Sequence, residues 1–143
     1  MPKLYLLHPA VVHFPIALLI VGFAGALAGF FSERWVRRAD AVSWLLWLGT
    51  ASAWVAMGLG LLAARTAPHV PPAWQTLDLH RTLAYWTVGV STFLSIWRLL
   101  RPDKWPVLFL ALWAAAAALV SATAYEGGEL VFTHNMATAA AQP

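Results

Sequence analysis

The chain contains no cysteine, which excludes three classes of structure at once. Disulfide bridges, iron–sulfur clusters held by thiolates and the Cys-x-x-Cys-His attachment of c-type haem all require that residue. Any metal or cofactor must therefore be held by His, carboxylate, Met or backbone groups. Charge is also scarce. Asp, Glu, Lys and Arg make up 10% of the 143 residues, whereas soluble domains carry about 25%.

Apolar residues make up most of the chain. Hydrophobic residues make up 61% of the chain and the mean hydropathy is +0.68, well above the apolar content of about 45–50% that is usual for soluble domains. Nine tryptophans suit membrane interfaces and the interior of a helix bundle. Composition and length therefore predict one integral membrane domain over residues 1–143. The net charge of +3 does not indicate nucleic-acid binding, because the basic residues lie in short loops.

Four stretches reach the length of about 20 apolar residues that a helix needs to cross the hydrocarbon core. They predict an all-α, integral membrane four-helix bundle. The first stretch is uncharged except for His13, and the second has no ionisable residue. Arg81 and Arg98 lie near the ends of the third, where their side chains can reach the interface. The expected spans are roughly 9–31, 41–64, 80–100 and 105–125, followed by a tail over 126–143.

Basic residues indicate the orientation of these spans. Six of the nine Lys and Arg lie in the first and third connections, at 32–40 and 98–104. Cytoplasmic loops carry the excess of such residues, so both termini and the loop at 65–79 are predicted on the periplasmic side of a bacterial inner membrane. Asp78, Glu126 and Glu129 then lie on that outer side, together with all five histidines, His8, His13, His69, His80 and His134.

The segment from His8 to Pro15 is the sharpest local motif. Each proline disfavours the helical conformation of the residue before it and is favoured in a first helical turn, so the segment predicts a stepped helix entry. His13 would lie about a turn deeper than His8. Alternatively, both histidines cap a helix at the interface. His69 lies between prolines and is interpreted as a solvated loop residue.

Two stripes of small residues follow histidines at helical spacing and could flank a flat macrocycle. Small residues also let bare helices pack closely in membranes, as in the Gly25-x-x-x-Gly29 spacing, and packing is the better interpretation of the stripes alone. The stripe below His13 is Ala17, Ile20, Ala24 and Ala28, and the stripe below His80 is Ala84, Thr87, Ser91 and Ser95.

The end of the chain carries a second motif, Glu126-Gly127-Gly128-Glu129 followed by an apolar triplet and His134. The paired glycines predict a sharp reversal, with the triplet folding back onto the outer mouth of the bundle and returning His134 towards the other histidines. A disordered tail is the alternative. Arg65 and Arg81 lie on the same side and could neutralise these glutamates or the propionates of a haem.

These motifs resemble the DUF2231 family of small bacterial membrane proteins over nearly the whole chain. The resemblance rests on His8-Pro9 with Val12-His13-Phe14-Pro15-Ile16-Ala17-Leu18, on a histidine that opens the third span, and on Gly127-Gly128-Glu129-Leu130-Val131 with His134. The family's final motif commonly ends His-Gly, whereas this chain has His134-Asn135, and Asn tolerates positive φ. The resemblance implies four spans and no established activity. Family members occur beside Rieske-type proteins, which favours redox chemistry, and His8, His13, His80 and His134 match family positions.

The leading hypothesis is a b-type cytochrome-like protein that holds haem b near the periplasmic face. His13 and His80 are the expected axial ligands because both lie in helical turns at similar depth. His8 and His134 would then be supporting groups, propionate partners or ligands of another centre. Such a protein would transfer electrons between quinol and a periplasmic redox protein and is not expected to be a stand-alone enzyme.

Two alternatives remain open from the sequence. His8, His13, His80 and His134 could form a non-haem site for copper, zinc or iron together with Glu126 or Glu129. The chain could instead be a non-catalytic accessory subunit of a larger respiratory complex, with histidines as polar caps. The glycine spacing at Gly25 makes a homo-oligomer plausible.

Overall fold

The computed structural model describes residues 6–31, 39–66, 70–100 and 106–136. Within them the chain is all-α, and four helical segments are long and apolar enough to cross a membrane. The predicted four-span architecture is confirmed. His69 and most of the basic residues of the first and third connections lie outside the described residues. The elements are α1 (Leu7–Val11), α2 (His13–Phe30), α3 (Ala39–Thr66), the 3-10 turn η3 (Pro71–Ala73), α4 (Trp74–Leu100) and α5 (Pro106–Phe132).

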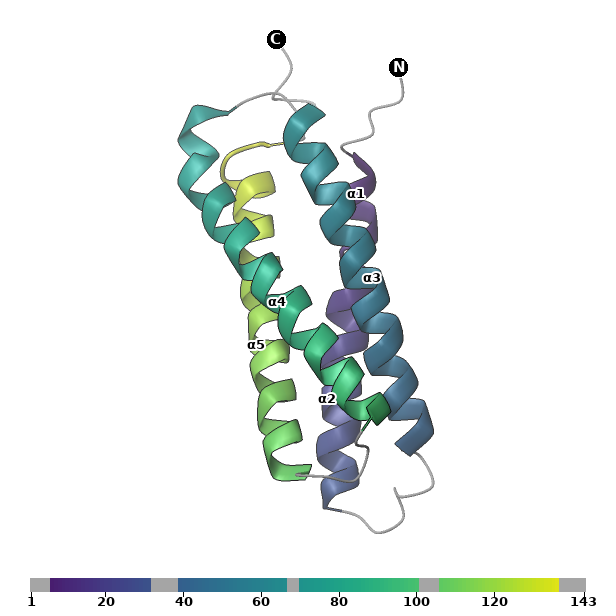
Figure 1. Cartoon of the computed structure of the whole chain (residues 1–143). Coiled ribbons are helices and arrows are strands. Elements are labelled where there is room, and N and C mark those ends of the chain that lie inside the picture. Colours follow the sequence, from purple (N-terminus) through teal and green to yellow (C-terminus); the bar gives the residue numbers. More distant parts are fainter. Residues whose placement is uncertain (1–5, 32–38, 67–69, 101–105, 137–143) are drawn as a thin grey trace.

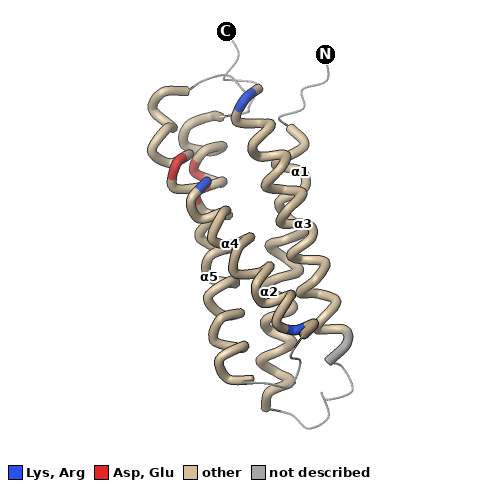
Figure 2. Tube along the Cα trace, viewed as in Figure 1, with Lys and Arg blue, Asp and Glu red and all other residues tan. Residues whose placement is uncertain are grey.

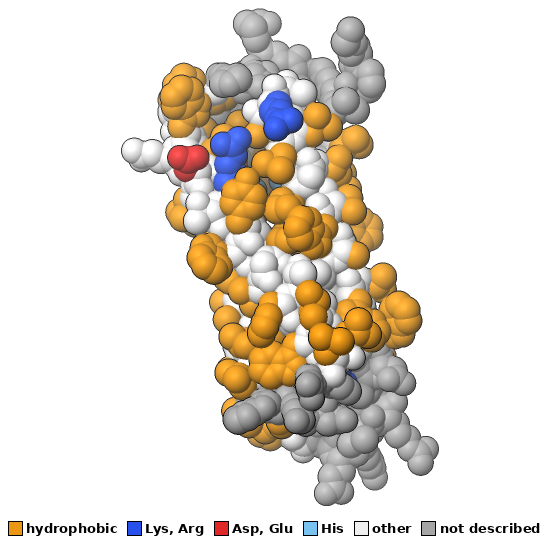
Figure 3. Space-filling model, in the orientation of Figure 1, with side chains coloured by type: hydrophobic (Ala, Val, Ile, Leu, Met, Phe, Trp, Pro, Cys, Tyr) orange, Lys and Arg blue, Asp and Glu red, His pale blue; other side chains and the backbone are white. Residues whose placement is uncertain are grey.

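The helices run alternately up and down the bundle (Figure 1). The start of α1, the end of α3, the start of α4 and the end of α5 lie at one end, which we call the histidine end because it carries His8, His13, His80 and His134. In Figure 2 the coloured charges lie towards the two ends and leave the middle of the bundle uncharged. Figure 3 shows apolar side chains along the length of one face, as expected for helices that face lipid.

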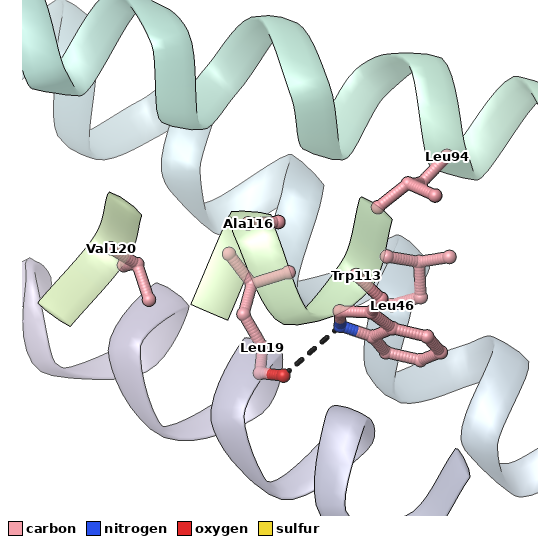
Figure 4. Packing of buried hydrophobic residues seen from close by; sticks show 6 residues of the cluster. All are labelled: Leu19, Leu46, Leu94, Trp113, Ala116 and Val120. Atoms are coloured by element: carbon pink, nitrogen blue, oxygen red, sulfur yellow. Dashed lines mark hydrogen bonds between the residues drawn. The ribbon is translucent and has the colours of Figure 1, made fainter. Parts of the chain in front are cut away.

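A small buried cluster holds the middle of the bundle together (Figure 4). Trp113 of α5 is 1% exposed, and its indole N–H donates to the Leu19 carbonyl of α2 at 3.1 Å. A Cβ atom at Gly22 would lie 2.7 Å from that indole, so α2 approaches α5 closely only because residue 22 is glycine. The cluster comprises Leu19, Leu46, Leu94, Trp113, Ala116 and Val120.

Two helix boundaries differ from the sequence prediction. Residues 71–79 are helical and extend the third span outward from His80, because Pro71 and Pro72 suit the first turn of a helix. The predicted reversal at Gly127 and Gly128 is wrong, since α5 continues through both glycines to Phe132. Residues 126–132 therefore belong to the helix and not to a tail. The chain turns only after Phe132, and Asn135 adopts a positive φ of 53° within that turn.

Candidate functional site

Pro15 separates the short helix that carries His8 from the long helix that follows it. Pro15 has no N–H to donate to the carbonyl of Val11, and its ring crowds that carbonyl, so the helix is interrupted at Val12 between α1 and α2. The predicted stepped entry is confirmed. His8 lies on the short α1, and its Nδ1–H donates to the carbonyl of Ala56 on α3 at 2.8 Å.

His80 has the same kind of partner on the other side of the bundle. Its Nδ1–H donates to the carbonyl of Thr123 on α5 at 2.9 Å. A carbonyl oxygen can only accept, so both imidazoles carry their proton on Nδ1 and keep the lone pair of Nε2 for another partner. The two ring centres are 6.1 Å apart and the ring planes are nearly perpendicular, at 84°. Two half-buried imidazoles from different helices therefore lie next to each other in a T-shaped arrangement, and among the described residues only the Nδ1 atom of each ring has a hydrogen-bond partner.

Glycines on the neighbouring helices make room for these rings. A Cβ atom at Gly60 of α3 would lie 3.0 Å from Cε1 of His8, and one at Gly127 of α5 would lie 3.2 Å from Cε1 of His80. Both distances are tighter than ordinary van der Waals contact. Each imidazole is thus held between a backbone carbonyl and a bare stretch of helix, which fixes its position as well as its tautomer.

The paired histidines line a pocket of about 470 Å³ at the histidine end of the bundle. Its volume lies within the range of about 300–1,000 Å³ that small-molecule and cofactor sites occupy. The walls are mostly apolar and come from α1, α2, α3, α4 and α5, and the polar groups include His13, Arg81 and Thr87. We call this cavity the histidine pocket. It combines apolar walls with a few convergent polar groups, as cofactor sites do.

The sequence-predicted histidines separate into three roles. His13 lines the histidine pocket, but its side chain is exposed, and the ring that lies against His80 is that of His8. The expected pairing of His13 with His80 is therefore not the ring contact that the structure forms. His134 is half-buried outside the pocket lining, and its Nε2 is hydrogen-bonded to Thr76 Oγ1 at 3.3 Å.

The two stripes of small residues also separate. The stripe below His80 faces the interior, with Thr87 and Ser91 buried. The stripe from Ala17 to Ala28 is exposed along its length, so within this chain it neither packs against another helix, which was the favoured interpretation, nor lines the pocket. The interior stripe of α1 and α2 starts from His8 and runs through Val12, Pro15, Leu19, Gly22 and Ala26.

The predicted charged residues lie around the pocket and not inside it, with one exception. Arg81 lines the pocket and lies 3.9 Å from Asp78, whereas Arg65 is exposed in the last turn of α3. Glu129 accepts a hydrogen bond from Thr133 at 2.8 Å, and Glu126 is half-buried outside the lining. In the described part of the chain, no group of three or more His, Asp or Glu side chains is placed to hold a metal ion.

Three further residues line the pocket that were not predicted from the sequence, namely Gly60, Met57 and Met136. Periodicity could have identified the first, because Gly60 follows Ala53 and Ala56 on the buried face of α3 at helical spacing. Met136 reaches the pocket because its N–H donates to the Leu130 carbonyl at 2.8 Å, which folds the chain back after Phe132. No local sequence pattern predicts that hydrogen bond.

Comparison with known proteins gives one match. A family model described as "Predicted membrane protein (DUF2231)" matches residues 6–140. Neither a curated protein nor a solved structure matches the chain.

Proposed function

The chain belongs to the DUF2231 family of predicted membrane proteins, and on that premise we propose that it is a b-type cytochrome-like electron-transfer protein that holds haem between His8 and His80. The observation that carries the proposal is the pair of facing imidazoles with both Nδ1 atoms bonded to carbonyls. Metal-bound histidines characteristically donate their other ring N–H to such a carbonyl or to a carboxylate.

The two rings are close enough to hold one metal together. With about 2.0 Å from metal to nitrogen and about 1.1 Å from nitrogen to ring centre, two imidazoles on one metal have centres at most about 6 Å apart, and the centres of His8 and His80 are 6.1 Å apart. Histidine is a common ligand of haem iron, so the proposal replaces His13 by His8 as the partner of His80.

The rest of the histidine pocket suits such a group. Its apolar walls would exclude water from a bound haem, and the Arg81 guanidinium at the pocket would pair with a propionate carboxylate. A bound haem would supply one-electron exchange at its iron. His8 and His80 would hold the haem, the carbonyls of Ala56 and Thr123 fix the tautomers of these imidazoles, and the apolar walls would bury the group; ligands, their hydrogen bonds and burial are means by which a protein sets a haem potential.

The orientation of the bundle supports a location for the histidine pocket and partners for electron transfer. The basic connections at 32–40 and 98–104 favour the cytoplasm, so the histidine pocket would open towards the periplasm of a bacterial inner membrane. Quinol in the bilayer is the proposed electron donor, and a periplasmic redox protein or a larger respiratory complex is the proposed acceptor. The chain would act as an electron-transfer subunit and not as a stand-alone enzyme.

Copper is the second candidate, because Met57 and Met136 line the same pocket as His8 and His80. Thioether and imidazole ligands together suit copper(I). Of the alternatives among non-haem metals, copper is therefore the one that the lining of the pocket favours. Iron and zinc sites usually add a carboxylate or a third histidine, and no such group was found among the described residues.

Optical spectra of the detergent-purified protein, oxidised and dithionite-reduced, test the proposal when combined with haem and metal analysis of the same sample. We expect stoichiometric iron and a sharp reduced α-band that His8→Ala and His80→Ala each abolish or strongly alter. His134→Ala is the matched control, since His134 is half-buried at the same end but outside the pocket lining. Rescue of His8→Gly by added imidazole would separate loss of a ligand from loss of fold.

Other outcomes decide against this assignment. Loss of the band in His13→Ala but not in His8→Ala would restore the pairing of His13 with His80. A colourless protein that carries copper would favour the copper site. A haem-supplied protein that carries neither haem nor metal would overturn both proposals.

A further inference from the structure

The bundle consists of two helical hairpins with the same internal register. The first hairpin is α1 and α2 with α3, and the second is α4 with α5; within each, the two long helices pack closely on each other. Position 80 follows position 8 by 72 places (80 minus 8), and the interior residues of α4 follow those of α2 by the same interval. The matched buried pairs are Pro15 with Thr87, Leu19 with Ser91, and Gly22 with Leu94.

The second long helices of the two hairpins, α3 and α5, are also related by a constant interval. Position 127 follows position 60 by 67 places (127 minus 60), and the buried residues of α5 follow those of α3 by that interval. A constant interval over four helical turns means that both hairpins present the same face to the interior. The matched buried pairs are Leu46 with Trp113, Gly49 with Ala116, and Ala53 with Val120.

The residues that contact the two imidazoles are related by the same intervals. His8 donates to the carbonyl of Ala56 and packs over Gly60, four residues further along α3. His80 donates to the carbonyl of Thr123 and packs over Gly127, four residues further along α5. Each hairpin thus carries one unit of histidine, carbonyl and glycine, and we call these the first and second histidine units.

We infer that the histidine pocket is a two-fold pseudo-symmetric clamp, in which each hairpin supplies an equivalent ligand and Gly60 and Gly127 are equivalent positioning residues. The inference rests on the proposed function for its ligand, a metal group with two equivalent faces. Repeats related by an axis along the membrane normal are known in membrane proteins. His8 of the first histidine unit and His80 of the second would together hold such a group.

The glycines act through the rings that they contact. A methyl group at residue 60 presses on Cε1 of His8, and the Ala56 hydrogen bond limits how far that ring can yield along the helix. The same holds for residue 127 and His80. Disturbing a group that orients a metal ligand typically costs about 10–100-fold in affinity, so each substitution should weaken binding by a similar factor within that range.

Four full-length variants test the clamp, with haem as the titrated probe and electron paramagnetic resonance of the oxidised sample as the second readout. Gly60→Ala and Gly127→Ala should each lower haem affinity by a similar factor and change the resonance of the iron. Gly58→Ala and Gly89→Ala are matched controls, because nothing lies within 4 Å of a Cβ at either position. The inference is overturned if the first pair behaves like the controls, or if only one of the two has an effect.

A cofactor-free measurement separates failure of the clamp from failure of the haem proposal. Nitrogen-15 spectra of histidine-labelled protein report the tautomer of each ring. Both His8 and His80 should carry the proton on Nδ1, with Gly60→Ala shifting only the His8 signals and Gly127→Ala only those of His80. If the protein binds no haem but both rings carry the proton on Nδ1, the haem proposal is overturned and the two equivalent histidine units are supported. An Nε2–H tautomer at either ring would overturn the units themselves.

Discussion

Of the described glycines, Gly22 is the one at which an added Cβ would come closest to another side chain, that of Trp113 in the other hairpin, and this makes Gly22→Ala the most informative stability variant. The added Cβ would lie 2.7 Å from Cζ2 of the indole and 3.2 Å from Cβ of Leu45. The indole cannot simply swing away, because it is 1% exposed and its N–H is bonded to the Leu19 carbonyl. We therefore expect α2 and α5 to move apart.

The cost can be worked out from three contributions. Overpacking a filled core typically costs about 1–3 kcal/mol. A weakened indole hydrogen bond adds about 1 kcal/mol. The better helix propensity of alanine returns about 0.5–1 kcal/mol. The net expectation is a loss of about 1–3 kcal/mol in the free energy of unfolding.

Unfolding by sodium dodecyl sulfate in mixed micelles, followed by far-ultraviolet circular dichroism, measures this free energy. Gly89→Ala is the control, because that position has no neighbour within 4 Å and should be unchanged or gain up to about 1 kcal/mol. If Gly22→Ala proved as stable as Gly89→Ala, the claim that this contact sets the spacing of the hairpins would be refuted.

Three further variants probe polar contacts outside the histidine pair. Thr50→Val should lower the free energy of unfolding by about 1 kcal/mol in the same assay, because the Thr50 hydroxyl is hydrogen-bonded to α4 across the interior. Ser121→Ala is the control and should change this free energy little, because Ser121 is exposed. His134→Ala should speed amide hydrogen exchange after α5, since it removes the bond to Thr76, whereas unchanged exchange would refute that anchor. Arg81→Gln should weaken haem binding severalfold in titrations, more at low salt than at high salt.

Composition and hydropathy were sufficient to predict the four spans, because the bilayer imposes a length and an apolar content on any helix that crosses it. The boundaries were harder to place. The end of α5 was predicted at Tyr125, yet the helix continues through Gly127 and Gly128 to Phe132. Glycine weakens a helix by about 1 kcal/mol, and packing of α5 along α4 outweighs that penalty. This packing energy is visible only in the tertiary structure.

The candidate site was predicted in part, and the error has a clear cause. The sequence identified the histidine end and His80, with its inward stripe through Thr87 and Ser91. It favoured His13 over His8 because His13 and His80 were expected in helical turns at similar depth. Depth does not determine the face of a helix. Counting back from the buried residues Gly22, Leu19 and Pro15 at helical spacing leads to His8, and that count needs to know which residues are buried.

The position of the histidine pocket limits what an electron-transfer protein of this shape can do. Helices α1 and α2 rise about 33 Å from His8 to Phe30, at 1.5 Å per residue. All four described histidines lie at the histidine end, and the middle of the bundle is filled by the apolar cluster around Trp113. On the proposed function, the described residues thus offer one redox centre at one side of the membrane. Electrons would enter and leave at that side, so transfer across the bilayer would require a second centre in a partner subunit.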